Sequence, residues 1–221
     1  MANNAYVILR RFLGVLEIAL YPLVVLAGSF GDNGPEWYYS ISASAYTNAA
    51  PVFHMIMGGS GLFLIAHGFA SRKDYGRVDF AVNALSGVFA LLIALFPCAY
   101  PGVVFAGVYP LPIQASALIH NISAAAFFGL RAFNILFLFT KTAGSPTPEK
   151  LTRNLVYRIC GIGIYGFMAF QVVTSFILAL ALPATMMNEI GMTVLDGVSW
   201  LVKSEAWFKD KISQAKLREQ A

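Results

Sequence analysis

Three residues of types that bind metals are spaced along this sequence so that they would lie at a similar depth if its apolar stretches cross a membrane as helices. His54 begins an apolar stretch, and His120 lies about two helical turns into another. Glu189 lies near the start of the last stretch. With about 1.5 Å of rise per helical residue, all three fall in the outer third of a bilayer. Two imidazoles and a carboxylate can bind zinc and leave a position open for water, whose pKa the metal lowers.

A zinc site of this kind would make the protein a metal-dependent hydrolase of lipid or amide bonds. Its proton-transfer group would be Asp196 or Glu17, which lie deeper in the apolar stretches. No His-x-x-x-His pair or other short-range pair of ligands accompanies the three residues. Zinc is therefore one candidate cofactor, and hydrolysis is one of three candidate activities.

The interpretation that we favour is a polar binding pocket that opens toward the outer surface. Its ligand would be a membrane lipid, a small amphiphile or a partner membrane protein subunit. Polar groups at membrane depth are costly and usually face a bundle interior or a cavity, where they mark function. The residues expected to line the pocket or lie at its mouth are His120, Asn121, Glu189, Ser42, Tyr46 and His54.

A third set of polar residues lies near the middle of the apolar stretches. Arg131 and Asp196 are expected to form a structural ion pair, because pairing reduces the cost of burying both charges. Alternatively, Glu17, Gln171 and Asp196 would pass protons between them, which predicts a small proton-coupled transporter. We find no inverted repeat in the two halves of the sequence, which disfavours the transporter.

The elements that must position these residues follow from the distribution of charge. The chain has 221 residues, of which 58% are hydrophobic, and its mean hydropathy is +0.67. All 15 Lys and Arg residues except Arg131 fall in four clusters that alternate with apolar intervals. Each interval is long enough for two crossings, and the connections around 31–51, 99–112 and 183–187 contain no Lys or Arg. Because cytoplasmic loops retain Lys and Arg, both termini are expected in the cytoplasm.

The sequence therefore predicts an all-α polytopic membrane protein with six transmembrane helices. Residues 1–203 form the membrane domain, and residues 204–221 form a short amphipathic cytoplasmic tail, expected to lie as a helix on the membrane. The expected spans are about 8–30, 52–70, 80–98, 113–140, 155–182 and 185–202.

Other signals are assigned to topology or packing rather than to chemistry. The formal net charge of +4 is explained by the cytoplasmic clusters, so no nucleic acid is expected as a partner. The run Gly58–Gly61 predicts close helix packing, as does a G-x-G-x-x-G at 161–166, because a dinucleotide site would need a preceding strand.

Several blocks of the sequence resemble an uncharacterised family of six-helix proteins of the bacterial inner (cytoplasmic) membrane. The blocks lie between residues 40 and 205 and are Ser40–Ala43, Tyr46-Thr47, Val52-Phe53, Ala94–Pro97, Leu118–His120, Phe137–Thr142, Arg153–Gly161 and Ser199–Lys203. The resemblance implies an inner-membrane location and matches the family's acid, histidine and glutamate to Asp79, His120 and Glu189. It departs from the family where Tyr46 replaces a histidine and Ala50-Pro51 replaces an Arg-Asp pair. The chain is more distantly similar to alkaline ceramidases and adiponectin receptors, without their His-x-x-x-His.

Overall fold

Long helices make up most of this protein. The computed structural model describes residues 4–30, 40–106, 110–142, 144–177 and 181–210. The long helices in these residues are α1 (Asn4–Gly28), α2 (Ala50–Tyr75), α3 (Arg77–Leu95), α4 (Ile113–Phe133), α5 (Pro148–Val172) and α6 (Ala181–Lys203). The short elements are the 3₁₀ helix η1 (Ser42–Tyr46), the paired strands β1 (Phe105–Ala106) and β2 (Leu111–Pro112), and the π-helical turns η2 (Asn134–Leu138) and η3 (Val173–Ile177).

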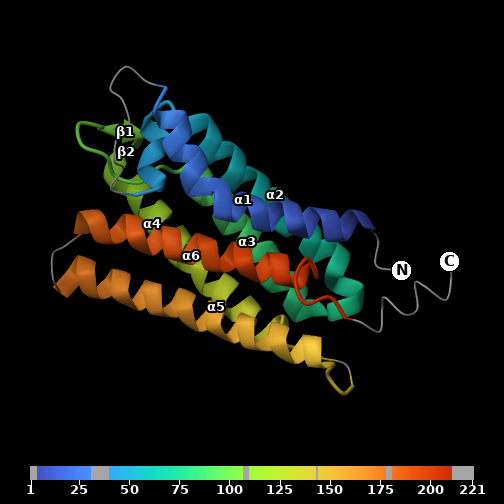
Figure 1. Ribbon diagram of the computed structural model, residues 1–221. Coiled ribbons are helices and arrows are strands. Elements are labelled where there is room, and N and C mark those ends of the chain that lie inside the picture. The colour runs from blue at the N-terminus through green and yellow to red at the C-terminus, as the bar shows by residue number, and fades with distance from the viewer. Residues whose placement is uncertain (1–3, 31–39, 107–109, 143, 178–180, 211–221) are drawn as a thin grey trace.

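The six helices form a closed bundle in which each helix packs against its neighbours in the chain. The bundle closes because α6 packs against both α5 and α1 (Figure 1). We call the end where α1 begins, α2 meets α3 and α6 finishes the terminal end. The opposite end, which carries η1, β1 and β2, is called the hairpin end. The expectation of an all-α protein is confirmed, and most of each predicted span overlaps one long helix.

Local sequence signals explain where several helices begin. Pro51 and Pro148 lie in the first turns of α2 and α5, where a missing N–H costs nothing. Thr147 caps α5, and its side chain accepts a hydrogen bond from the backbone N–H of Lys150. Gly76 separates α2 from α3 with a φ of 94°, a conformation that favours glycine.

Glycines bring two pairs of helices into close contact. A Cβ added at Gly87 of α3 would lie 2.4 Å from the backbone oxygen of Gly61 in α2. A Cβ at Gly197 of α6 would similarly lie 2.7 Å from the oxygen of Gly14 in α1. Of the run predicted to pack closely, Gly61 does so, whereas Gly58 has no atom within 4 Å of an added Cβ. Small residues thus allow backbone approach where lipid offers no hydrophobic drive.

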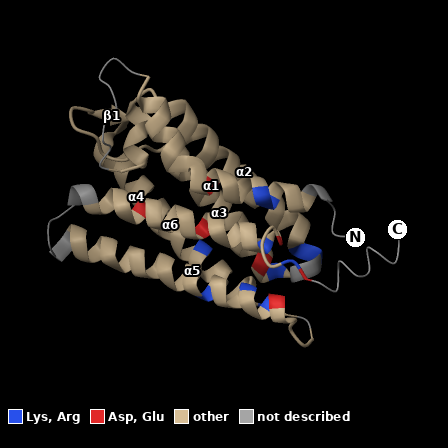
Figure 2. Ribbon diagram, viewed as in Figure 1, with Lys and Arg blue, Asp and Glu red and all other residues tan. Residues whose placement is uncertain are grey.

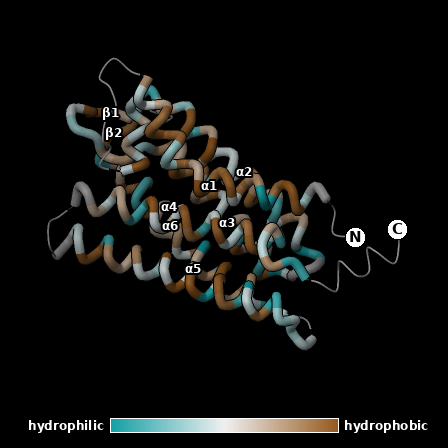
Figure 3. The backbone as a smooth tube through the Cα atoms, viewed as in Figure 1, coloured by the Kyte–Doolittle hydropathy of each residue, from teal (hydrophilic) through white to brown (hydrophobic). Residues whose placement is uncertain are grey.

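Five of the helices, α1 to α5, are long and apolar enough to cross a membrane by length and composition. Helix α6 is not among them, since it carries Asn188, Glu189 and Asp196. Figure 2 shows the described Lys and Arg residues gathered toward the terminal end. Arg131 is fully buried. Figure 3 shows hydrophobic residues over much of the length of the helices.

The segment after α6 does not continue as a helix. Residues 204–210 form turns, and Glu205 and Phe208 adopt φ angles of 54° and 57°. Arg153 of α5 holds this segment through hydrogen bonds to the Phe208 carbonyl at 2.6 Å and the Asp210 carboxylate at 2.8 Å. The rest of the predicted amphipathic tail, 211–221, lies outside the described residues.

Candidate functional site

Three polar side chains from distant parts of the chain meet at the hairpin end, and we call them the Ser42 cluster: Ser42, His120 and Glu189. Ser42 is the first residue of η1, and its hydroxyl oxygen lies 3.0 Å from Nε2 of His120 and 3.4 Å from Oε1 of Glu189. The backbone N–H of Ile41 donates to Oε2 of Glu189. The cluster therefore ties η1 to both α4 and α6.

The protonation pattern of His120 follows from its partners. Its Nδ1 lies 2.8 Å from the carbonyl oxygen of Phe96, which follows the last residue of α3. Because a carbonyl only accepts hydrogen bonds, Nδ1 carries a hydrogen. In the neutral ring Nε2 is then an acceptor, and the Ser42 hydroxyl donates to it. Ser116, one turn earlier in α4, donates to the Pro97 carbonyl at 2.9 Å and fixes the same junction.

A cavity of about 520 Å³ lies between α4, α5 and α6, directly beside the Ser42 cluster. Two members of the cluster, His120 and Glu189, face it, and so does Asn121. The full lining is His120, Asn121, Ala124, Ala125, Phe128, Met168, Ala169, Gln171, Val172, Ser175, Thr185, Glu189 and Met192. Three of the six residues predicted for a binding pocket thus line one cavity.

Gln171 supplies a second polar group to the cavity. Its Nε2 donates to the hydroxyls of Ser175 at 2.8 Å and Thr185 at 2.9 Å, and its Oε1 accepts from Nδ2 of Asn188 at 2.6 Å. These bonds join the end of α5 to the beginning of α6. Sequence reasoning missed Ser175 and Thr185, although the spacing of Gln171 and Ser175 by four residues places both on one helix face.

The remaining residues predicted for the pocket lie away from the cavity lining. Ser42 is buried behind His120 and Glu189. Tyr46 donates to the Cys98 carbonyl at 2.7 Å and stacks on Tyr100, with ring centroids 4.7 Å apart. Burial, and to a lesser extent Cys98, raises the pKa of Tyr46 to about 12, so this phenol remains a donor at neutral pH. It fixes the position of η1.

The predicted zinc site is wrong in its ligand set. Among the described residues, no three His, Cys, Asp or Glu side chains lie close enough to hold a metal ion together. His54 makes an edge contact with the ring of Phe53 and does not join His120 and Glu189. The physical reason is that helix rotation, which depth alone does not give, turns His54 elsewhere. Both ring nitrogens of His120 also have protein partners already.

The ion pair expected between Arg131 and Asp196 is present. Nε and Nη2 of Arg131 lie 3.0 Å and 2.8 Å from the Asp196 carboxylate oxygens, and both side chains are buried. The guanidinium also lies over the ring of Trp200, 4.8 Å from its centroid. The pair joins α4 to α6 in the bundle interior.

The proton relay proposed through Gln171 is not assembled. Glu17 lies beside Asp196, since a Cβ added at the adjacent Gly197 would be 3.1 Å from the Cβ of Glu17. Gln171 instead bonds to Thr185 and Asn188, and Asn188 precedes Asp196 by eight residues, or about 12 Å of helix. Glu17 Oε2 is buried without a hydrogen-bond partner in the described part of the chain.

The acid that the family resemblance adds to the site lies at the opposite end of the bundle. Asp79 opens α3 at the terminal end, and its carboxylate lies 3.5 Å from Nζ of Lys141. Asn83 donates to its carbonyl, and Asn134 of η2 donates to Asn83. Asp79 therefore fastens α3 to the end of α4, whereas His120 and Glu189 converge at the hairpin end.

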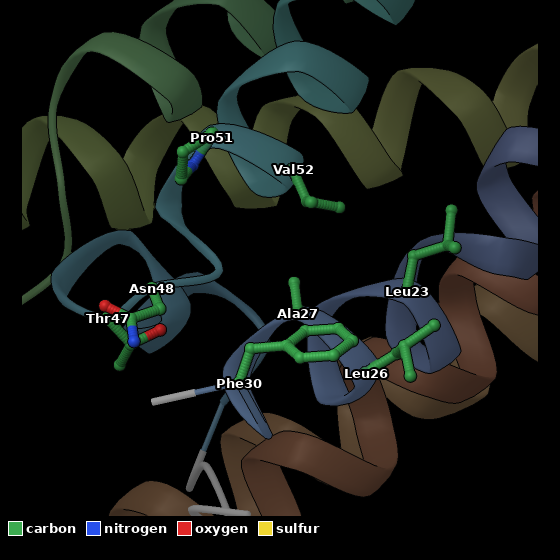
Figure 4. A pocket seen from close by; sticks show the side chains of 8 residues that line it. All are labelled: Leu23, Leu26, Ala27, Phe30, Thr47, Asn48, Pro51 and Val52. Carbon is green, nitrogen blue, oxygen red and sulfur yellow. The ribbon is translucent and has the colours of Figure 1, made fainter. Parts of the chain in front are cut away.

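A second hollow lies on the surface between α1 and α2 near the hairpin end. It measures about 720 Å³ and is largely apolar, with Thr47 and Asn48 at one side, as Figure 4 shows. Its lining is Leu23, Leu26, Ala27, Phe30, Thr47, Asn48, Pro51 and Val52. None of these side chains is titratable, so this hollow offers no acid–base chemistry.

Comparison with known proteins adds no relative that would identify the site. The resemblance to a bacterial inner-membrane family therefore remains a prediction based on the sequence blocks given above. No family model, no curated protein and no solved structure matches the chain.

Proposed function

We propose that this protein crosses a membrane with all six helices and binds a small amphiphile in the cavity between α4, α5 and α6. The crossing of α6 is supported by the direction of its polar side chains, because Thr193, Asp196 and Ser199 are all buried inside the bundle. A helix with polar residues on its inward face can cross a membrane together with apolar neighbours. The Lys and Arg residues at the terminal end favour a cytoplasmic position for that end, as in a bacterial inner membrane.

The observation that carries the binding function is the change in polarity along the cavity. Helices α4 and α6 run from the hairpin end toward the terminal end, so His120 and Glu189 lie nearer the hairpin end than Phe128 and Met192. Helix α5 runs the other way and repeats the order, with Gln171 nearer the hairpin end than Met168. The cavity is therefore polar near one membrane surface and apolar toward the middle, as an amphiphile requires.

The size of the cavity suits a single-chain ligand. Small-molecule pockets are typically about 300–1,000 Å³, and this one measures about 520 Å³. His120 and Phe128 are eight residues apart on α4, which corresponds to about 12 Å of cavity length. A compact head group with a medium-length chain would fill this space.

Entry from the surrounding lipid is favoured by the exposure of two cavity walls. Asn121 and Ala125 of α4 and Ala169 and Val172 of α5 line the cavity and are also exposed on the outside of the bundle. Val172 is 55% exposed. The cavity thus opens sideways between α4 and α5, so a membrane-dissolved ligand would reach it without passing through the bundle.

The test is to narrow the cavity from its exposed walls. Ala125→Leu with Ala169→Leu would add apolar volume at positions where the fold has room, and Ala66→Leu on the exposed face of α2 is the matched control. The measurement is binding of a fluorescent single-chain amphiphile to the protein in nanodiscs, with empty nanodiscs subtracted. We expect the double variant to bind at least about tenfold more weakly and the control to match wild type. Equal binding by all three proteins would overturn the proposed function.

A further inference from the structure

The polar end of the cavity contains an acidic side chain and no Lys or Arg among the described residues. Among the described residues that line the cavity, Glu189 is the only acidic one, and none is Lys or Arg. The nearest buried guanidinium, that of Arg131, is bound by Asp196. The other Lys and Arg residues in the described part of the chain lie toward the terminal end (Figure 2). A ligand head group placed here would therefore meet a carboxylate with no cation beside it.

Two of the groups around the polar end, the His120 ring and the Gln171 amide, already have acceptors for their hydrogens. The Nδ1–H of His120 is directed at Phe96, and Nε2 faces Ser42. Both hydrogens of the Gln171 amide have acceptors in Ser175 and Thr185. These groups can hold the walls of the cavity together, but they have no hydrogen left for an anionic head group.

Acceptors, in contrast, remain available. The contact of Glu189 Oε1 with the Ser42 hydroxyl is long, at 3.4 Å, and a hydrogen bond weakens with such length. In the protonation state derived above, that hydroxyl donates to His120 instead. A buried acceptor without a close donor is costly, so this Glu189 oxygen, which faces the cavity, would gain from a donor-rich ligand.

We propose that the ligand is a long-chain amine, and that its protonated amino group binds Glu189 as counter-ion. This inference rests on the proposed amphiphile-binding function. An ammonium group has three donors and no acceptor, which complements the carboxylate oxygens of Glu189. A fatty acid or phosphate head would instead place like charges together in a site of low dielectric constant, at a large cost.

The experiment compares ligands that share a dodecyl chain and differ in the head group. Dodecylamine, dodecyltrimethylammonium, dodecanol and dodecanoate are titrated at pH 7 into nanodiscs of uncharged lipid, with and without protein. We expect dodecylamine to bind at least about tenfold more tightly than dodecanol, because hydrogen bonds to charged groups are worth that much. Dodecyltrimethylammonium, which keeps the charge without N–H donors, should fall between them, and dodecanoate should bind most weakly.

The role of Glu189 is tested with Glu189→Gln. The control is Glu205→Gln, at a partly exposed side chain near the terminal end. Glu189→Gln should abolish the preference for dodecylamine over dodecanol, whereas the control should keep that preference. Equal binding of amine and alcohol by wild type would overturn the amine inference but not the proposed function. Binding of none of the four would overturn both. The ligand series in wild type gives this answer even if Glu189→Gln does not fold.

Discussion

The Arg131–Asp196 pair provides the sharpest prediction about stability. Asp196→Asn removes the carboxylate that accepts three hydrogen-bond contacts from Nε and Nη2 of Arg131. The guanidinium is fully buried and would remain as a charge without its partner. Removal of one member of a buried ion pair typically costs about 3–5 kcal/mol, so we expect Asp196→Asn to lower the free energy of unfolding by that amount.

Glu17 modifies this expectation in a way that can be measured. It is buried beside Gly197, within electrostatic range of both Arg131 and Asp196, and its Oε2 has no hydrogen-bond partner among the described residues. Arg131 thus has a second carboxyl group near it, besides that of Asp196. When Asp196 is replaced, Glu17 can take over part of the pairing, so the single variant should lie near the lower limit of the range, about 3 kcal/mol.

A double-mutant cycle separates these contributions. Glu17→Gln alone should cost less than about 1 kcal/mol, because Asp196 still pairs with Arg131. Glu17→Gln with Asp196→Asn should cost more than the sum of the two single variants, by about 1–2 kcal/mol, because no carboxylate is then left for the guanidinium. The assay is denaturant unfolding in mixed micelles, followed by the fluorescence of Trp200, which lies against the guanidinium.

The apolar exchange Arg131→Met with Asp196→Leu is the control, since replacing both members of a buried pair is often neutral or stabilising. If Asp196→Asn costs less than about 1 kcal/mol, the pair is not the buried and closed contact that the geometry indicates. If the two carboxyl substitutions are additive within about 0.5 kcal/mol, Glu17 does not share the cation.

Two further predictions concern the packing of α2 against α3 and the segment after α6. Gly87→Ala should destabilise the fold by more than about 1 kcal/mol, because its Cβ would lie 2.4 Å from a backbone oxygen of α2. Gly58→Ala should have little effect, because no atom lies within 4 Å of its added Cβ. Thermal unfolding of both variants tests this difference. Burial raises the pKa of Asp210, but hydrogen bonds from Arg153 and Thr147 outweigh it and leave the pKa below its ordinary value. The stabilisation by Asp210 is therefore fully present above about pH 4 and is lost as the pH falls through the lowered pKa. Asp210→Asn should destabilise the protein more at pH 7 than at pH 3, and an equal effect at both would contradict the ion pair.

The spans could be predicted because apolar length and charge placement are local properties of the sequence. One difference is at the start of α5, which begins at Pro148 rather than near residue 155. The prediction excluded the charged residues before 155 because they do not suit a bilayer. The helix nevertheless extends through them, because Thr147 caps it and Pro148 fits its first turn. An apolar stretch and the helix that contains it can begin at different residues for this reason.

The candidate site could be predicted only in part. Position along a helix is readable from the sequence, and His120 and Glu189, expected at one depth, are joined through Ser42 in the structure. Rotation about the helix axis is not readable in a bundle with apolar residues on every face, and this is why His54 was wrongly added to them. Gln171 was expected with Glu17 for the same reason, but its face of α5 turns toward Thr185 and the cavity.

The spacing of α6 explains why two carboxylates of one helix have different roles. Glu189 and Asp196 are seven residues apart, so they lie on nearly the same face, about 10.5 Å from each other. At the deeper level Arg131 fills the space in front of Asp196 and neutralises it, which leaves a closed contact with no room for a ligand. At the level of Glu189 no such cation is present among the described residues, and a cavity takes its place. A carboxylate with its own counter-ion serves the fold, whereas one that faces a cavity without a counter-ion can take that counter-ion from a ligand.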